Sequence, residues 1–298
     1  MTPPSQVDHG LADLPAAELG PAVLQAWDEF IALAAGLDLG APTRLTGWRA
    51  HDVLVHLGAW PEHDAVADLV ASAGASTGPH LNADRTNQRV VSAHREASRA
   101  EVLAALSAAR ERVADYFSTR HDTHGCELGS SVLGPLPLGT VVHAVCYELA
   151  VHALDLAPRE ASGPLLDRGL AALVDTTGAL SARHAITIEV AATTPTGGWS
   201  FSSSARGWTT HALEAGRVSG VGIEGPAALI LEASAGRANP IPLLVSRKLV
   251  VHKLPSLLRL APLVEEVPGI PGGTALKGAI KHLAGAGRLL GKLPGFRR

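Results

Sequence analysis

The stretch TVVHAVCYELAVHALDLA, residues 140–157, decides the fold of this chain, because it predicts a long apolar helix that carries two polar side chains. Thr140 is the expected N-cap, and Pro158 is the expected stop. Glu148 and His152 lie four residues apart, so both side chains project from one helix face. Burying an unpaired carboxylate is costly, and a bound cation removes that cost. The stretch therefore predicts a helix that offers a chelating pair.

Three more helices are expected before this one. Apolar residues recur at helical spacing from Pro21, the expected first helical position, to about Leu37. A second helix is expected near residues 48–60, and a third over 82–120 with an interruption near Ser98. Four helices joined by loops, without strand alternation, predict a four-helix bundle whose core can hold a site.

The pattern changes after Pro158. A helical segment over 165–183 is followed by short runs of β-propensity, punctuated by Gly and Pro, and then by a helix that ends at Gly236. The fold class is therefore α+β with two domains. The expected divisions are a metal-binding helical bundle over 1–162, a small α+β domain over 163–265 and a basic, Gly- and Leu-rich tail over 266–298.

Composition excludes several classes of protein. The 298 residues are 46% apolar and 18% charged, with a net charge of −3, which favours a globular protein over a nucleic-acid binder. The apolar runs are too short for a membrane span, and two cysteines make no disulfide framework. The beginning of the chain has no signal-peptide layout, so the expected location is the cytoplasm. The bias toward Ala and Gly is typical of high-GC bacteria such as actinobacteria.

A third ligand would turn the Glu148–His152 pair into a metal site. His56, on the inner face of the second expected helix, is the best supplier, and a His2Glu set leaves one coordination position open. Asp52 and Asp155 each share a helix face with one of these histidines and are expected to orient it. Ordinary helix capping is the equal alternative for Asp52.

The spacing of Glu148 and His152 is also compatible with a purely structural role. Fifteen Glu and 14 His residues in this chain give about 0.7 pairs of that spacing by chance. The alternative is a helix-stabilising pair with a hydrogen-bonded core histidine. His51, His63 and His143 are expected to be solvated or simple core histidines.

Two segments resemble one known family. GAPTRLTGWRAHDVLVHLGAW, residues 40–60, resembles the Pro-Thr…Gly-Trp…Asp-x3-His-Leu segment of the DinB-like mycothiol-dependent maleylpyruvate isomerase family, and ELAVHALDLA, residues 148–157, resembles its Glu-x3-His-x2-Asp helix. VSGVGIEGPAALILEASAGRANP, residues 218–240, is similar to the family's sterol-carrier-protein-like α+β module, in which a Gly-Pro…Gly-Arg pattern opens and closes a helix.

The resemblance implies Zn²⁺, or another divalent metal, held by His56, Glu148 and His152, with an open position for the thiol of mycothiol. The thiolate would add to the activated C=C of a maleyl-type diacid, permit rotation and leave as the trans isomer, or the adduct would be released as in a thiol S-transferase. The diacid needs cations, for which Arg85, Arg89 and Arg49 are candidates. The string NADRTNQRV does not choose among them.

Two other functions stay open on the sequence. One is a metal-dependent hydrolase in which Asp155 assists a water molecule as base. The other is a non-catalytic protein whose second domain binds a small or lipid-like molecule. The expected partners are a small electrophile and a low-molecular-weight thiol, without nucleic acid or membrane span, in a monomer or homodimer.

Overall fold

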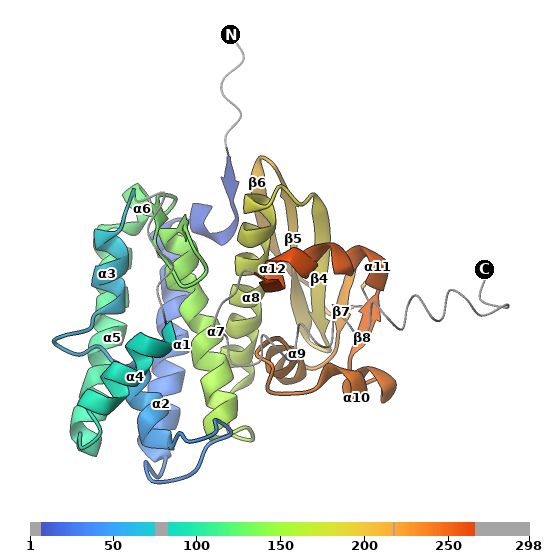
Figure 1. The fold of residues 1–298 in the computed structure, drawn as a ribbon. Coiled ribbons are helices and arrows are strands. Elements are labelled where there is room, and N and C mark those ends of the chain that lie inside the picture. Colours follow the sequence, from blue (N-terminus) through green and yellow to red (C-terminus); the bar gives the residue numbers. More distant parts are fainter. Residues whose placement is uncertain (1–6, 75–82, 217, 266–298) are drawn as a thin grey trace.

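The computed structural model describes residues 7–74, 83–216 and 218–265, and it has a helical bundle beside a sheet (Figure 1). α8 (Gly163–Arg183) lies between them, packing against α7 on one side and the strands β4, β5 and β6 on the other. The expected mixed α+β architecture is confirmed. The predicted basic tail over 266–298 lies outside the described residues.

The helices α1, α2, α5 and α7 form the centre of the bundle, and α3, α4 and α6 lie around them. α1 packs against α5 and α7, and α2 packs against α5, around a core that includes the buried residues Phe30, Leu54 and Leu149. No helix in the described part of the chain is long and apolar enough to cross a membrane. The bounds of these helices are α1 (Ala16–Gly36), α2 (Ala50–Leu57), α3 (Ala65–Ala71), α4 (Ala83–Ala93), α5 (Arg99–Thr119), α6 (His121–His124) and α7 (Leu138–Leu156).

The predicted first residues of α1 and α7 are wrong. α1 begins at Ala16, so Pro21 lies inside the helix. The N–H of Ala16 donates to Asp122 at 2.7 Å, and this contact from a distant segment satisfies a free N–H of the first turn. α7 begins at Leu138, so Thr140 is a buried residue within the helix rather than its cap.

Backbone carbonyls replace the expected side-chain cap of α7. The N–H of Leu138 donates to the carbonyl of Glu127 at 2.8 Å, and that of Gly139 donates to Gly125 at 2.8 Å. The predicted interruption near Ser98 is confirmed. Ser98 caps α5 by accepting from the N–H of Glu101, while the Glu101 carboxylate accepts from the N–H of Ser98 at 2.7 Å.

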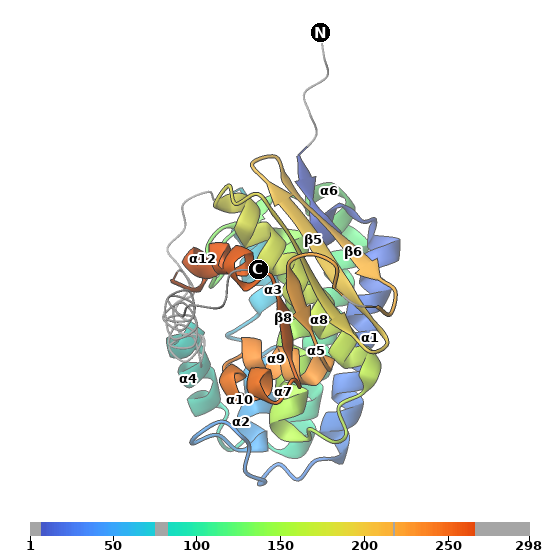
Figure 2. The same cartoon turned by 90° about the vertical axis from the view of Figure 1, so that its right-hand side faces the viewer.

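The sheet has six strands in the order β1-β6-β5-β4-β7-β8. Figure 2 shows β5 and β6 side by side. β4 pairs antiparallel with β5 and parallel with β7, while β1, at the start of the chain, pairs parallel with β6. No strand was predicted there, and the segment Asp8–His9 thus belongs to the sheet although it precedes the bundle. The strands are β1 (Asp8–His9), β4 (Ile188–Thr194), β5 (Gly197–Ser204), β6 (Gly207–Leu213), β7 (Gly222–Glu224) and β8 (Val250–His252), with β2 (Leu128–Gly129) and β3 (Leu136–Pro137) forming a separate pair.

Short helices complete the second half of the chain. α9 packs against both α8 and α7, so this half makes contact with the bundle through two helices. Gly236 follows α9 with φ +67°, a left-handed conformation that favours glycine, close to the predicted helix end. The short helices of this half are α9 (Ala227–Ser234), α10 (Pro240–Val245), α11 (Leu254–Leu257), η2 (Leu258–Leu260) and α12 (Ala261–Glu265). One further short helix, η1 (Gly10–Asp13), lies in the first half, directly after β1.

One buried carboxylate joins the N-terminal turn, α8 and the sheet. Asp175, fully buried on α8, accepts hydrogen bonds from the N–H of Leu11 at 3.0 Å, the indole of Trp208 at 2.9 Å and the hydroxyl of Thr210 at 2.7 Å. Gly10 has φ +59°, and a Cβ there would lie 2.0 Å from the Trp208 indole nitrogen. Glycine is therefore required for the close approach of this turn.

Replacing Asp175 by Ala would leave three buried donors without an acceptor. We expect Asp175→Ala to lower the free energy of unfolding by about 3 kcal/mol, measured by urea denaturation. Asp115→Ala, at an exposed position on α5, is the control and should change it by less than about 0.5 kcal/mol. Equal effects of the two substitutions would contradict this role of Asp175.

Candidate metal centre

α2 and α7 bring His56, Glu148 and His152 together. His56 lies in the last turn of α2, and the other two lie one turn apart on α7. One ligand atom from each residue lies within 4.8 Å of those of the other two. The rings of His56 and His152 meet edge to face, with centroids 5.5 Å apart. This spacing is small enough for one ion to contact all three residues after small side-chain rotations.

The three residues differ in their contact with solvent. The side chain of His152 is only 7% exposed, whereas that of Glu148 is 53% exposed. The expectation that Glu148 interrupts a fully buried face is therefore wrong. Ala144 and Val145, on the same face of α7, are also partly accessible, so this face borders an opening. The set is thus closed on the His152 side and open on the Glu148 side.

A continuous line of charges runs through His152. Its Nε2 atom lies 3.5 Å from Oε2 of Glu148, and its Nδ1 atom lies 3.1 Å from Oδ2 of Asp155, which is buried. Arg237 then donates from Nε to Oδ1 of Asp155 at 3.0 Å. Asp155 is therefore bonded both to the His152 ring and to a guanidinium, an arrangement that restricts the orientation of the ring.

Arg237 is a site residue that the sequence analysis did not single out. It follows α9 in the second half of the chain, where its N–H donates to the carbonyl of Glu232 at 2.8 Å. In the sequence, the Gly-Arg pair at 236–237 predicts only the end of a helix. Two more contacts join the same regions: an ion pair between Arg44 and Glu232, and a hydrogen bond between the hydroxyls of Tyr147 and Ser234 at 3.2 Å.

These contacts shift pKa values in opposite directions along the line. Burial alone would lower the pKa of His152, but its hydrogen bonds to Asp155 and Glu148 outweigh burial and raise it to about 9. Burial would raise the pKa of Asp155, but the hydrogen bonds from His152 and Arg237 lower it. Without a metal, His152 is thus a cation between two carboxylates.

His56 behaves differently because no carboxylate is bonded to it. Burial and the positive charge of His152 lower its pKa to about 4, against smaller opposing effects of Glu148 and a hydrogen bond with Asn87. At neutral pH this imidazole is uncharged, which is the form that binds a metal. The ring of Trp48 packs edge to face on it, with centroids 5.7 Å apart.

Asn87 was also missed, although the sequence carries a signal for it. Asn87, Val90 and Val91 recur at helical spacing on α4, and Asn87 is the polar residue of this group. Arg85 and Arg89 lie two residues away on either side and are exposed. The structure thus directs Asn87 toward His56.

The other aspartate and histidine candidates make contacts outside the His–Glu–His set. Asp52 accepts from the N–H of Arg49 at 2.8 Å at the start of α2, which is the capping role weighed for it. The ring of His51 is bonded to the carbonyl of Ala97 at 3.0 Å. Nδ1 of His63 lies 3.8 Å from Asp68, and Nδ1 of the buried His143 lies 3.8 Å from Asp175.

Arg49 lines a cleft of about 560 Å³ between the loop before α2 and the helix α4. Arg95 lies in the same cleft, and Trp48 contributes to its wall while touching His56. Arg49, one of the three predicted arginines, therefore borders a cleft that is joined to His56 through Trp48.

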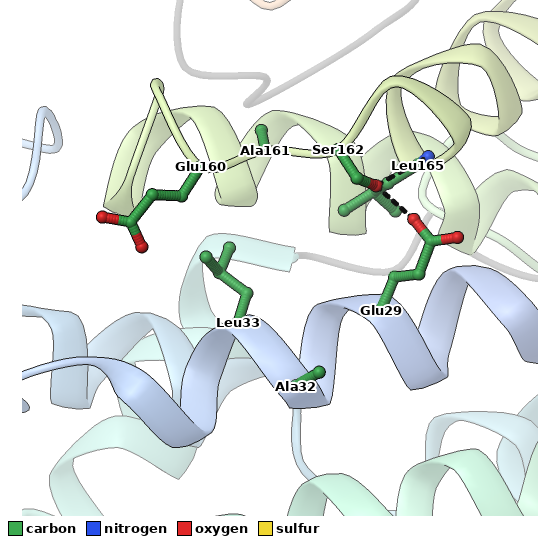
Figure 3. Close-up of a pocket in the computed structure, with 7 residues that line it drawn as sticks. All are labelled: Glu29, Ala32, Leu33, Glu160, Ala161, Ser162 and Leu165. Carbon is green, nitrogen blue, oxygen red and sulfur yellow. Dashed lines mark hydrogen bonds between the residues drawn. The ribbon is translucent and has the colours of Figure 1, made fainter.

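A second recess lies elsewhere, between α1 and the segment that leads into α8 (Figure 3). Its volume is about 310 Å³, and Ala32, Leu33 and Leu165 give it a mainly apolar wall. Ser162 caps α8 by accepting from the N–H of Leu165 at 3.2 Å and donates to Glu29 of α1. The polar groups of this recess are thus engaged in joining two helices.

The helical region matches a known family. Residues 23–157 match the family model of the mycothiol maleylpyruvate isomerase N-terminal domain. Over these residues the helical region is therefore similar to that domain family. The matched residues include His56, Glu148, His152 and Asp155, whereas Arg237 lies beyond them.

Two solved structures are similar to the chain. One is the mycothiol-dependent maleylpyruvate isomerase, at 16% identity and a TM-score of 0.49, and the other is a point mutant of that enzyme, at 15% and 0.48. Each similarity covers 77% of this chain and 92% of the other chain. No curated protein matches the sequence of this chain.

The raised pKa of His152 has a consequence for metal-free protein. Its folded-state pKa of about 9 exceeds the ordinary value of 6.5. The contacts of protonated His152 with Asp155 and Glu148 therefore stabilise the fold fully below about pH 6.5, and this stabilisation is lost as pH rises through 9. We expect Asp155→Asn to lower the pKa of His152, followed by NMR titration of the imidazole in chelator-treated protein. Asp115→Asn is the control, and an unchanged pKa in Asp155→Asn would contradict the role of Asp155.

Proposed function

We propose that this protein is a metal-dependent, mycothiol-using enzyme that adds a thiol to the activated double bond of a small electrophile. Isomerisation of a maleyl-type diacid such as maleylpyruvate is the leading reaction, and thiol S-transfer is the alternative outcome at the same site. The observation that carries the proposal is the cluster of His56, Glu148 and His152 inside a domain of the maleylpyruvate isomerase family.

The donor set fits a divalent metal such as Zn²⁺. Two imidazoles and one carboxylate are common zinc ligands, and three protein ligands leave a fourth position open. His56 is neutral at pH 7 because burial lowers its pKa to about 4. Bonding of Nδ1 of His152 to Asp155 leaves Nε2 on the side of Glu148, where a metal would displace the proton. Glu148 lies at the open side, from which a thiol and a substrate would enter.

When bound, Zn²⁺ would lower the pKa of a coordinated thiol, so that a thiolate nucleophile is available near neutral pH. The residues of the chain supply the framework. Asp155 and Arg237 hold the ring of His152 in one orientation, and Asn87 and Trp48 hold that of His56. Arg237 comes from outside the bundle, so the second half of the chain is part of the machinery in this proposal.

The cleft beside His56 suits an anionic substrate. Arg49 and Arg95 give it positive charge, while the carboxylate of Asp52, which also lines the cleft, is bonded to the backbone N–H of Arg49. A guanidinium binds a carboxylate through paired, charge-assisted hydrogen bonds. We therefore assign the substrate carboxylates to this cleft and choose Arg49 among the three predicted arginines. In isomerisation the sulfur adds to one carbon of the double bond and leaves from it after rotation, with no net change of atoms or electrons.

The metal is tested by its content in protein purified without chelator. We expect His152→Ala to hold one equivalent of Zn²⁺ per chain fewer than wild type and to lose thiol-dependent activity. His211→Ala, at an exposed position on β6, should match wild type in both. Maleylpyruvate and mycothiol are the probes. An equal zinc content in wild type and His152→Ala, or full turnover without thiol, would overturn the proposal.

The substrate cleft is tested by kinetics. Arg49→Ala removes a charge-assisted contact worth about 1.5–3 kcal/mol, so we expect KM for a dicarboxylate substrate to rise about 10- to 100-fold while the zinc content stays unchanged. Arg159→Ala, an exposed arginine outside the cleft, provides the matched control. A KM unaffected by Arg49→Ala would place the carboxylates elsewhere.

A further inference from the structure

A second group of metal-binding side chains lies at the opposite end of α7. His9 of β1, Asp13 of η1 and Cys126, in the loop after α6, have ligand atoms within 4.8 Å of one another. η1 packs on the first turns of α7, near Gly139, where Ala12 is in close contact. Gly139 and His152 are thirteen residues apart on that helix, or about 20 Å at 1.5 Å per residue. The two clusters are therefore separate.

The distances fit the coordination geometry of zinc. Nδ1 of His9 and Sγ of Cys126 each lie 3.3 Å from the same atom, Oδ1 of Asp13. Tetrahedral zinc with bonds of about 2.0–2.3 Å places its ligand atoms roughly 3.3–3.5 Å apart. The two measured edges already have this length. A small rotation of the side chains would direct all three atoms at one centre.

The charges of the donor set also fit. A thiolate and a carboxylate together neutralise Zn²⁺, and the imidazole adds a neutral ligand. The Cys126 thiol, which is exposed, donates to Oδ1 of Asp13 at 3.3 Å. Zinc binding would replace this hydrogen bond and release the thiol proton to solvent.

The backbone holds the three residues in place before any metal binds. Oδ2 of Asp13 accepts from the N–H of His9 at 2.6 Å, and the ring of His9 meets Trp208 edge to face at 6.0 Å. Cys126 lies between Gly125 and Glu127, whose carbonyls accept from the first two N–H groups of α7. The cluster therefore joins a two-residue edge strand of the sheet to the start of the central helix.

We propose that His9, Asp13 and Cys126, with a water molecule as the fourth ligand on the exposed side, form a Zn²⁺ site that fastens the N-terminal strand β1 to the bundle. β1 pairs with β6 over only two residues, so this edge gains most from an additional link. The proposal is independent of the catalytic one, because the two sites share no residue.

The experiment uses the full chain with His152→Ala, which removes the first site. We expect this variant to keep about one Zn²⁺ per chain and to gain roughly 5 °C in Tm with saturating zinc. Cobalt(II) in place of zinc should give thiolate-to-cobalt charge-transfer absorption. Adding Cys126→Ser or His9→Gln should abolish the bound metal and the Tm gain, whereas adding His211→Ala should change neither.

Two outcomes would overturn the proposal. One is a His152→Ala protein that takes up no zinc and shows no charge-transfer absorption, a result that needs no cysteine variant and so does not depend on its folding. The other is zinc retained in the double variant with Cys126→Ser. If wild type binds two equivalents of Zn²⁺ per chain and His152→Ala binds one, both proposed sites are supported.

Discussion

The buried carboxylate of Asp175 is the constraint on which the arrangement of the chain depends. A charge without solvent contact is stable only when donors surround it, and here three donors come from the N-terminal turn and from β6. Asp175 lies on α8, the helix between bundle and sheet (Figure 1). The need to satisfy one oxygen atom therefore fixes the N-terminus, the sheet and the central helix relative to one another.

Close packing of α8 on α7 connects this arrangement to the candidate metal centre, because α7 carries Glu148 and His152. Gly169 of α8 lies against Ala150 of α7, and a Cβ at Gly169 would come within 2.4 Å of that methyl group. The two helices thus approach closely, and α9, which packs on both, places Arg237 against Asp155. A site with ligands on α2 and α7 is in this way completed by an arginine from the other half of the chain, and its electrostatics depend on how the two halves meet.

Much of the site follows from local rules. Helical spacing puts Glu148, His152 and Asp155 on one side of α7, and the interruption at Ser98 follows from a capping box. The missed features all depend on distant contacts. Asp122 satisfies the true start of α1, solvent reaches Glu148 because its face of α7 is only partly covered, and Asn87 meets His56 because α4 packs on α2.

The sequence by itself determined the mixed α+β class, the helical domain and the grouping of Glu148, His152 and Asp155, because these depend on periodicity within one segment. Only the tertiary structure decided that His56 lies within reach of that pair, that Arg237 holds Asp155, and that His9 and Cys126 meet over Asp13. The physical reason is that ion pairs and metal sites join residues far apart in the chain, and local propensity contains no information about which distant segments pack together.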